Sequence, residues 1–230
     1  MIDEWVRLPS RWINDKGLGY FSWKAGGEGS AHTAALMALT AIAHGAIPET
    51  GLTRGTYDEL CAATGLSRAK LSNGLDVLRE FEIVGRGPES GRSTYQLLGY
   101  NFNRGWAKLP KKSMYSHGRI TAFADFQLRK PIELEALKLF FLFVARRGND
   151  TNVANIGYEK IEEYTDIQRP RIKPAISYLA SLSLIYVEHF TSRTSPERIS
   201  SGYRIVGIDP HNHAGTTGRG QTDYTEELQS

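Results

Sequence analysis

Hydrophobic residues recur at helical spacing in the segment that follows Ser67. Leu71, Leu75 and Leu78 are separated by four and three residues, which places them on one face of a helix. Ser67 is a favourable N-cap for that helix, because its hydroxyl can accept a bond from a free backbone N–H. The polar positions that this spacing turns outward are Arg68, Lys70, Asn73 and Arg79.

A shorter helix is predicted immediately before it, over residues 56–64. Thr56 suits its N-cap, and Asp58 and Glu59 suit its first turn, where the helix dipole favours negative charge. Gly65 then ends the helix. The two helices are thus joined by a turn of about three residues.

A β-hairpin is predicted after the second helix. Ile83 and Val84 begin one strand, the turn-rich segment 85–92 contains three glycines and a proline, and residues 95–98 form the returning strand. The order is therefore helix, turn, helix and hairpin.

The same order recurs later in the chain. The segment Trp5–Pro9 (WVRLP) is echoed by Trp106–Pro110 (WAKLP), an offset of 101 residues. At this offset apolar positions coincide in pairs: Leu36 with Leu137, Leu39 with Phe140, Ile42 with Phe143, Leu60 with Ile161, Leu71 with Ile172, Leu75 with Ile176 and Leu78 with Leu179. Beyond residue 185 the best offset becomes 108, so the second hairpin carries about seven extra residues, as a surface loop can.

The motif formed by residues 60–68 (LCAATGLSR), the leucine stripe after it and a strand that starts at Ile83 resembles the winged helix-turn-helix fold of many bacterial regulators. The resemblance covers roughly residues 34–100 and, through the repeat, roughly 133–208. It implies an α+β, mainly helical protein of two tandem winged helix-turn-helix domains related by internal duplication. We expect domain 1 at residues 1–101 with an N-terminal extension, domain 2 at 102–210 with a longer wing, and a disordered tail at 211–230.

The resemblance also implies which residues contact DNA. The second helix of each pair would enter a major groove and each hairpin, or wing, would contact the backbone or a minor groove. Arginine suits guanine, and asparagine or glutamine suits adenine. The residues expected at the interface are Ser67, Arg68, Lys70, Asn73, Arg86 and Arg92 in the first domain and Gln168, Arg169, Arg171, Lys173, Arg193, Arg198 and Arg204 in the second.

Two prolines set the second copy apart. Pro170 suits the first turn of a helix, but Pro174 would remove a hydrogen bond from its interior. Either the helix begins near Pro174 and residues 169–173 form a basic lead-in, or the helix is kinked, and we favour the later start. The segment 14–30, which is rich in glycine and aromatic residues, predicts an irregular or hairpin-like extension.

Charge is distributed unevenly, although the net charge is only +3. Residues 1–101 hold 10 basic and 11 acidic side chains, whereas residues 102–210 hold 17 and 11. The second half should therefore supply most of the attraction to phosphates. Four cations near its start fit either a phosphate-contacting linker or a solvated connection: Lys108, Lys111, Lys112 and Arg119.

Several classes of protein are disfavoured. Cys61 is the only cysteine, which argues against a disulfide scaffold or a cysteine-rich zinc site and for a reducing compartment. The longest apolar run, residues 137–145, is too short to cross a bilayer, and the acidic N-terminus does not resemble a signal peptide. Phosphate-loop, nucleophile-elbow and metalloprotease motifs are not found, and His211 and His213 lack a third metal ligand. We expect no enzymatic activity, cofactor or metal.

The segment 133–147 predicts a helix that is apolar on most of its circumference, so it must be covered on both sides. Packing of the two copies within one chain is the favoured cover, ahead of a homodimer interface.

Together these observations predict a cytoplasmic, nucleoid- or plasmid-associated protein that binds double-stranded DNA sequence-specifically, as an intrachain pseudo-dimer on a bipartite site. The architecture is similar to that of plasmid replication initiators, so a plasmid or mobile-element initiator and a transcriptional regulator are the favoured roles. A conjugation or partition accessory protein remains an alternative, as does a protein-interaction module that does not bind DNA.

Overall fold

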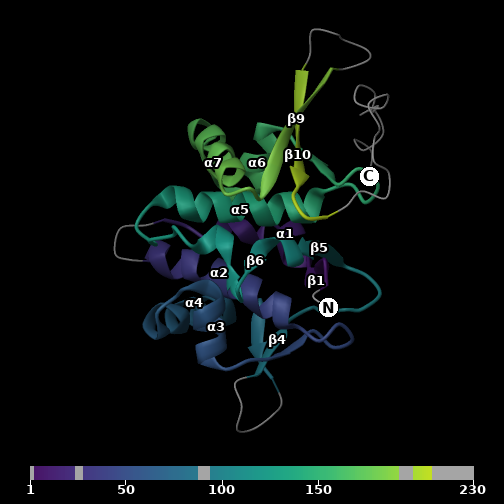
Figure 1. Cartoon of the computed structure of the whole chain (residues 1–230). Helices are drawn as coiled ribbons and strands as arrows, with labels where there is room; N and C mark the ends of the chain where they lie inside the picture. The colour runs from purple at the N-terminus through teal and green to yellow at the C-terminus, as the bar shows by residue number, and fades with distance from the viewer. Residues whose placement is uncertain (1–2, 24–27, 88–93, 192–198, 209–230) are drawn as a thin grey trace.

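The computed structural model describes residues 3–23, 28–87, 94–191 and 199–208 (Figure 1). This part of the chain contains seven α-helices and several small antiparallel sheets, so the predicted α+β class is confirmed. The tail predicted to be disordered, residues 211–230, lies outside the described residues.

The elements of the first half are, in chain order, β1 (Trp5–Pro9), α1 (Arg11–Asn14), the 3-10 helix η1 (Gly17–Tyr20), α2 (Glu28–Gly45), β2 (Leu52–Arg54), α3 (Tyr57–Thr64), α4 (Arg68–Glu80), β3 (Val84–Arg86) and β4 (Thr94–Leu97). Those of the second half are β5 (Trp106–Pro110), η2 (Lys112–Met114), β6 (Tyr115–Ser116), β7 (Arg119–Ile120), η3 (Thr121–Phe123), α5 (Pro131–Arg146), β8 (Val153–Asn155), α6 (Tyr158–Thr165), α7 (Arg169–Ser181), β9 (Ile185–Thr191) and β10 (Ile199–Ile205).

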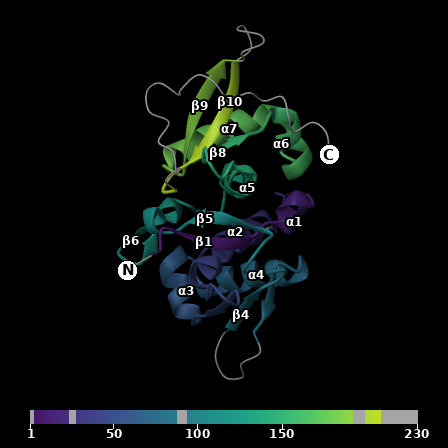
Figure 2. The same cartoon turned by 90° about the vertical axis from the view of Figure 1, so that its right-hand side faces the viewer.

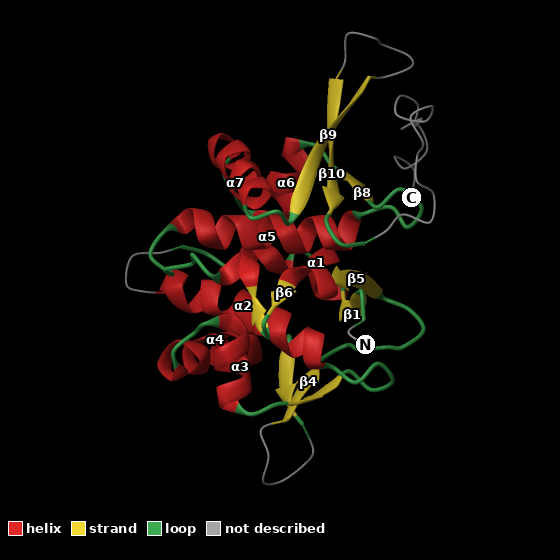
Figure 3. Cartoon of the chain, viewed as in Figure 1, coloured by secondary structure: helices red, strands yellow, loops and turns green. Residues whose placement is uncertain are grey.

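The two halves match in element length as well as in order. Helices α3 and α6 have 8 residues each, α4 and α7 have 13, and β2 and β8 have 3. In each of these pairs the second member begins 101 positions after the first. Each half also holds a three-stranded antiparallel sheet, in the order β2-β4-β3 and β8-β10-β9, and the two sheets lie at opposite ends of the molecule (Figure 3).

Two long helices form the centre of the molecule. Helix α2 packs against α3 and α4 on one side and against α5 on the other, and α5 packs against α6 and α7 (Figures 1 and 2). Helix α5 is buried from Leu134 to Val144 except at Glu135. The cover predicted for this helix therefore comes from within the chain, and its apolar circumference is explained by neighbours on both sides.

The two echoed segments, Trp5–Pro9 and Trp106–Pro110, pair with each other. Strands β1 and β5 form an antiparallel ribbon in which Trp5 lies opposite Pro110, Arg7 opposite Lys108 and Pro9 opposite Trp106. The first residue of each echoed segment thus lies opposite the last residue of the other. The central residues, Arg7 and Lys108, lie opposite each other. This is the pairing that a pseudo-two-fold axis between the halves would produce.

The leading segment of each half lies against the other half. Helix η1 packs on α6, where Lys16 forms a 2.8 Å ion pair with Glu163. Strand β7 packs on α3, and its Arg119 guanidinium covers Gly65 at the end of that helix. Each half therefore contributes a segment that packs on a helix of the other half.

Two local predictions are wrong. Helix α7 begins at Arg169 and continues through Pro174, so the favoured later start is incorrect. Pro174 has no backbone N–H, so the Pro170 carbonyl lacks its helical hydrogen bond. Both prolines are exposed, so water can bond to that carbonyl. Burial of Ile172 and Ile176 in the core stabilises the helix. For segment 14–30 only the hairpin-like alternative is wrong: its described part contains the end of α1, η1 and the start of α2, joined by irregular residues.

Candidate nucleic-acid interface

The turn between α3 and α4 is fixed by its own side chains. Thr56 and Glu59 form a capping box at the start of α3, and Gly65 ends that helix in the left-handed region at φ 75°. The Ser67 hydroxyl accepts a 3.3 Å bond from the Lys70 backbone N–H, so it caps α4 as predicted.

The same turn recurs between α6 and α7. In the first half the Thr64 hydroxyl donates to the Leu60 carbonyl at 2.7 Å and accepts from the Leu66 N–H at 3.3 Å. In the second half Thr165 donates to Ile161 at 2.6 Å and accepts from Ile167 at 3.3 Å.

Both threonines are fully buried, and each bonds to a backbone carbonyl of the preceding helix and to a backbone N–H within the turn. The two helix pairs are therefore held at their joints by the same hydrogen bonds.

The predicted DNA-contacting residues of α4 lie on its exposed surface. Ser67, Arg68, Lys70 and Asn73 are all exposed. Arg68 forms a 2.6 Å ion pair with Asp58, in which both side chains remain largely exposed, and the Lys70 Nζ donates to the Ser30 hydroxyl at 2.6 Å. A phosphate or base could displace Asp58 from Arg68 at modest cost, because exposed ion pairs contribute little free energy.

The predicted residues of α7 are exposed too, but one of them, Arg171, has a stronger protein partner. Gln168 and Lys173 are exposed at the surface. The Arg169 guanidinium lies 3.9 Å from Glu162, and Arg171 forms a 2.7 Å ion pair with Glu135, whose side chain is only 13% exposed. Burial raises the pKa of Glu135, and Arg171 opposes that effect by stabilising the carboxylate.

Of the predicted wing residues, the structure describes one side chain. Arg204 on β10 bonds to both oxygens of Glu188 on β9 and donates to the Thr151 carbonyl at 2.7 Å, so DNA would have to compete for it. The side chain of Arg86, whose backbone belongs to β3, lies outside the described residues, as do Arg92, Arg193 and Arg198.

Sequence reasoning missed a second cationic surface on the β1–β5 ribbon. Arg7 and Lys108 lie directly opposite each other there, and Trp5 and Trp106 stack beside them with ring centroids 5.7 Å apart. The signal was visible in the echoed segments, where a tryptophan is followed two residues later by a cation. The sequence predicts Lys108 as a possible phosphate contact in a linker, but not its place beside Arg7, because pairing of the two segments is a tertiary event.

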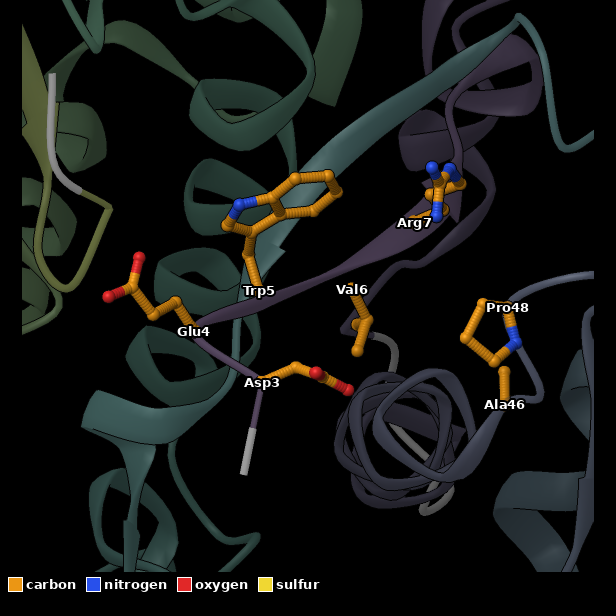
Figure 4. A pocket seen from close by; sticks show the side chains of 7 residues that line it. All are labelled: Asp3, Glu4, Trp5, Val6, Arg7, Ala46 and Pro48. Carbon is orange, nitrogen blue, oxygen red and sulfur yellow. The ribbon is translucent and has the colours of Figure 1, made fainter. Parts of the chain in front are cut away.

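A pocket of about 310 Å³ adjoins this ribbon, between β1 and the residues that follow α2 (Figure 4). Its lining is mixed: Asp3, Glu4, Trp5, Val6, Arg7, Ala46 and Pro48. Trp5 and Arg7 extend from one side of β1 and Val6 from the other, toward the helix (Figure 4). No group of three or more residues able to hold a metal ion occurs among the described residues, and none of the helices described there has the length and apolar character to span a membrane.

Comparison with protein-family models gives no match, and comparison with curated proteins gives none either.

Proposed function

We propose that this chain is a sequence-specific double-stranded DNA-binding protein composed of two tandem winged helix-turn-helix units, which act together as a pseudo-dimer. The observation that carries the proposal is the matched pair of helix joints. Thr64 and Thr165 make the same two hydrogen bonds, and each joint is followed by a 13-residue helix and an antiparallel hairpin.

The chemistry of the helix surfaces supports DNA as the ligand. The first turns of α4 and α7 expose Arg68 and Lys70, and Arg169 and Arg171, at corresponding positions. A helix start also presents free backbone N–H groups and a positive dipole end, which favour phosphate. Asn73 adds an exposed amide that can read an adenine edge.

The proposed target is bipartite and asymmetric. Two recognition helices in one chain can occupy successive major grooves, about 10 bp apart, and their different residues would read different half-sites. A plasmid or mobile-element replication initiator and a transcriptional regulator both fit this activity. Repeated target copies at an origin would favour the initiator, and one operator upstream of a gene would favour the regulator.

Selection of bound duplexes from a random-sequence pool by the purified full chain tests the proposal. The expected result is a two-part motif with half-sites about one helical turn apart and an affinity that falls steeply with salt. Enrichment of no sequence, together with no duplex binding at low ionic strength, would overturn it and favour a protein-interaction module.

A pair of variants on α4 sharpens the test. Arg68→Ala should reduce discrimination at one base pair by about tenfold to a hundredfold and leave the other half-site unchanged. Arg79→Ala removes the same charge from the last turn of the same helix, where Arg79 pairs with Asp76, and should alter neither half-site. Equal effects of the two substitutions on all sequences would contradict base reading by the start of α4.

A further inference from the structure

The outer face of the β1–β5 ribbon collects positive charge without acidic partners. Arg7 and Lys108 are cross-strand neighbours at its centre, a pairing of like charges that destabilises a sheet. Arg147, just beyond α5, is close enough that its charge adds to burial in lowering the pKa of Lys108. We call Arg7, Lys108 and Arg147 the cation cluster.

None of the three cations forms an ion pair with an acidic side chain of the described residues. The buried Nε atoms of Arg7 and Arg147 have no hydrogen-bond partner, but the other nitrogens of these groups bond to neutral partners only: Arg7 to the Tyr100 hydroxyl, and Arg147 to the Gly148 carbonyl at 3.2 Å and Asn149 Oδ1 at 3.4 Å. Asp3 and Glu4, which precede β1, line the same pocket as Arg7, but no ion pair joins either of them to it (Figure 4). No acidic side chain of the described residues therefore neutralises the cluster, and an anionic ligand would do so.

Aromatic rings surround these cations. Trp5 and Trp106, the tryptophan pair, stack at an interplanar angle of 16° and are partly exposed. Arg7 lies 4.9 Å from the Trp106 ring centroid and 4.2 Å from that of Phe102, and Lys108 lies 4.7 Å from that of Trp5. Arg7 and Lys108 therefore cover aromatic ring faces on which a planar ring of a ligand could stack.

This face is distant from the proposed recognition surface. The start of α4 is tied to Ser30 in the first turn of α2, whereas the ribbon is tied to the other end of that helix, where His44 Nε2 donates to the Pro110 carbonyl at 2.8 Å. Fourteen residues of helix span roughly 21 Å. In the second half, Arg171 pairs with Glu135 near the start of α5, whereas Arg147 follows the other end of that helix. A ligand on the ribbon is accordingly separate from one at the starts of α4 and α7.

We propose that the outer face of the β1–β5 ribbon is a second binding site, for a nucleotide unit whose phosphate binds the cation cluster and whose base stacks on the tryptophan pair. A phosphate would attract the cations away from the aromatic rings, so that the base could stack on the ring faces. Cationic side chains next to stacking aromatic rings are how proteins bind unpaired nucleotides. A free nucleotide and a single strand share this chemistry; a duplex does not, because its base faces are already stacked.

Tryptophan fluorescence of the purified full chain measures binding at this face. The probes are a thymidine oligonucleotide of about ten nucleotides, a free nucleoside monophosphate and a fully paired duplex of unrelated sequence. The expected result is saturable quenching by the oligonucleotide or by the monophosphate, whichever is the natural source, and none by the duplex at the same concentration. Stronger quenching by the oligonucleotide assigns a strand, and equal quenching by both assigns a free nucleotide.

Lys108→Gln should weaken binding of the quenching probe about tenfold, and Lys108→Arg should restore most of it. Trp106→Leu, monitored through the remaining tryptophans and by competition, should weaken it similarly. Lys112→Gln is the matched control, because this exposed cation lies in η2, immediately after the ribbon. Thermal unfolding of each variant checks that the fold is retained.

The proposal is overturned if neither the oligonucleotide nor the monophosphate binds saturably, if only the duplex binds, or if Lys108→Gln and Lys112→Gln have equal effects. Concentration-dependent self-association that Trp106→Leu abolishes, without nucleotide binding, would identify the face as a contact between copies instead. Binding of the selected duplex target should be unchanged in Lys108→Gln, so this site and the proposed recognition helices can fail independently.

Discussion

The two halves of this molecule have helices of the same order and length and the same threonine bonds at the joints, but different chemistry around them. In the first half Thr56 and Glu59 form a capping box and Gly65 occupies the left-handed turn position. In the second half Gly157 starts α6 without a side-chain cap, and Asp166 adopts the left-handed conformation at φ 54°. Only the buried threonine of each joint is shared, so the packing of the core, more than the caps, holds the common arrangement.

The halves also differ in how their cations are used. The second half carries more basic residues, yet Arg171 and Arg204 are engaged by Glu135 and by Glu188. In the first half Arg68 pairs with an exposed acid only. The net charge of the second half therefore overstates the cationic surface that it offers to DNA, because some of its arginines form ion pairs within the protein.

A close helix contact at Gly74 distinguishes the halves and gives the largest expected effect. A Cβ on Gly74 of α4 would lie 2.7–2.8 Å from backbone atoms of Ala34 and Ala35 in α2, whereas the matching position in α7 is already the buried Ala175. Gly74→Ala should lower the free energy of unfolding by about 3 kcal/mol, since backbone atoms cannot rotate away. Ala175→Gly should cost only about 1 kcal/mol. Denaturant unfolding measures both, and equal losses would contradict closer packing in the first half.

His44 gives the first half a pH dependence that its counterpart, Ala145, cannot supply. Complete burial lowers the pKa of His44 from 6.5 to about 3, although its bond to the Pro110 carbonyl opposes the shift. The unfolded chain therefore takes up this proton first as the pH falls, so stability is full above pH 6.5 and is lost between 6.5 and about 3.

Between pH 6.5 and 5 the loss from this group should be about 2 kcal/mol. His44→Gln should flatten the profile in that window, and His32, whose pKa burial also lowers, should account for part of the remaining slope. An unchanged profile in the variant, measured by denaturant unfolding at each pH, would exclude His44 as its source.

The capping difference should have a smaller effect. Thr56→Ala removes the hydroxyl that accepts the Glu59 N–H at 3.2 Å and should cost about 1 kcal/mol. Gly157→Ser introduces a capping hydroxyl at the corresponding site, where Glu159 and Lys160 follow, and should stabilise the second half by a few tenths of a kcal/mol. If Thr56→Ala has no effect on thermal unfolding, the capping box is not what stabilises α3.

The exposed ion pair should matter least for stability. Arg68 and Asp58 are 67% and 75% exposed, so Arg68→Ala should change the free energy of unfolding by less than about 0.5 kcal/mol. Unfolding in denaturant checks this, and a loss above 1 kcal/mol would show that the arginine has a structural role. The substitution is then suitable for testing DNA contact alone.

The helices of both halves could be predicted from the sequence because their signals are local. The leucine stripe from Leu71 to Leu78, the Ser67 cap and the Gly65 stop each act within one or two turns, and all three are observed. The three-residue strands β2 and β8 were missed because they are too short to carry a pattern and form only by pairing with the hairpins. The start of α7 was mispredicted since local rules weigh Pro174 without the packing of Ile172 and Ile176.

For the candidate site, the exposure of Arg68, Lys70 and Asn73 follows from helix period alone, whereas Gln168 and Lys173 were assigned through the resemblance. The engagement of Arg171 and Arg204 follows from neither, because their partners are 36 and 16 residues away in the chain. The β1–β5 face depends still more on tertiary structure.

The order of elements, the 101-residue offset and the outward positions of the helices were determined by the sequence, since each depends on neighbours within a few residues or on comparison of one segment with another. Tertiary structure decided that the echoed segments pair, that the leading segment of each half lies on the other, and that Arg7 and Lys108 meet between stacked tryptophans. The physical reason is that hydrogen bonds between strands and contacts between like charges depend on which distant segments the buried core brings together.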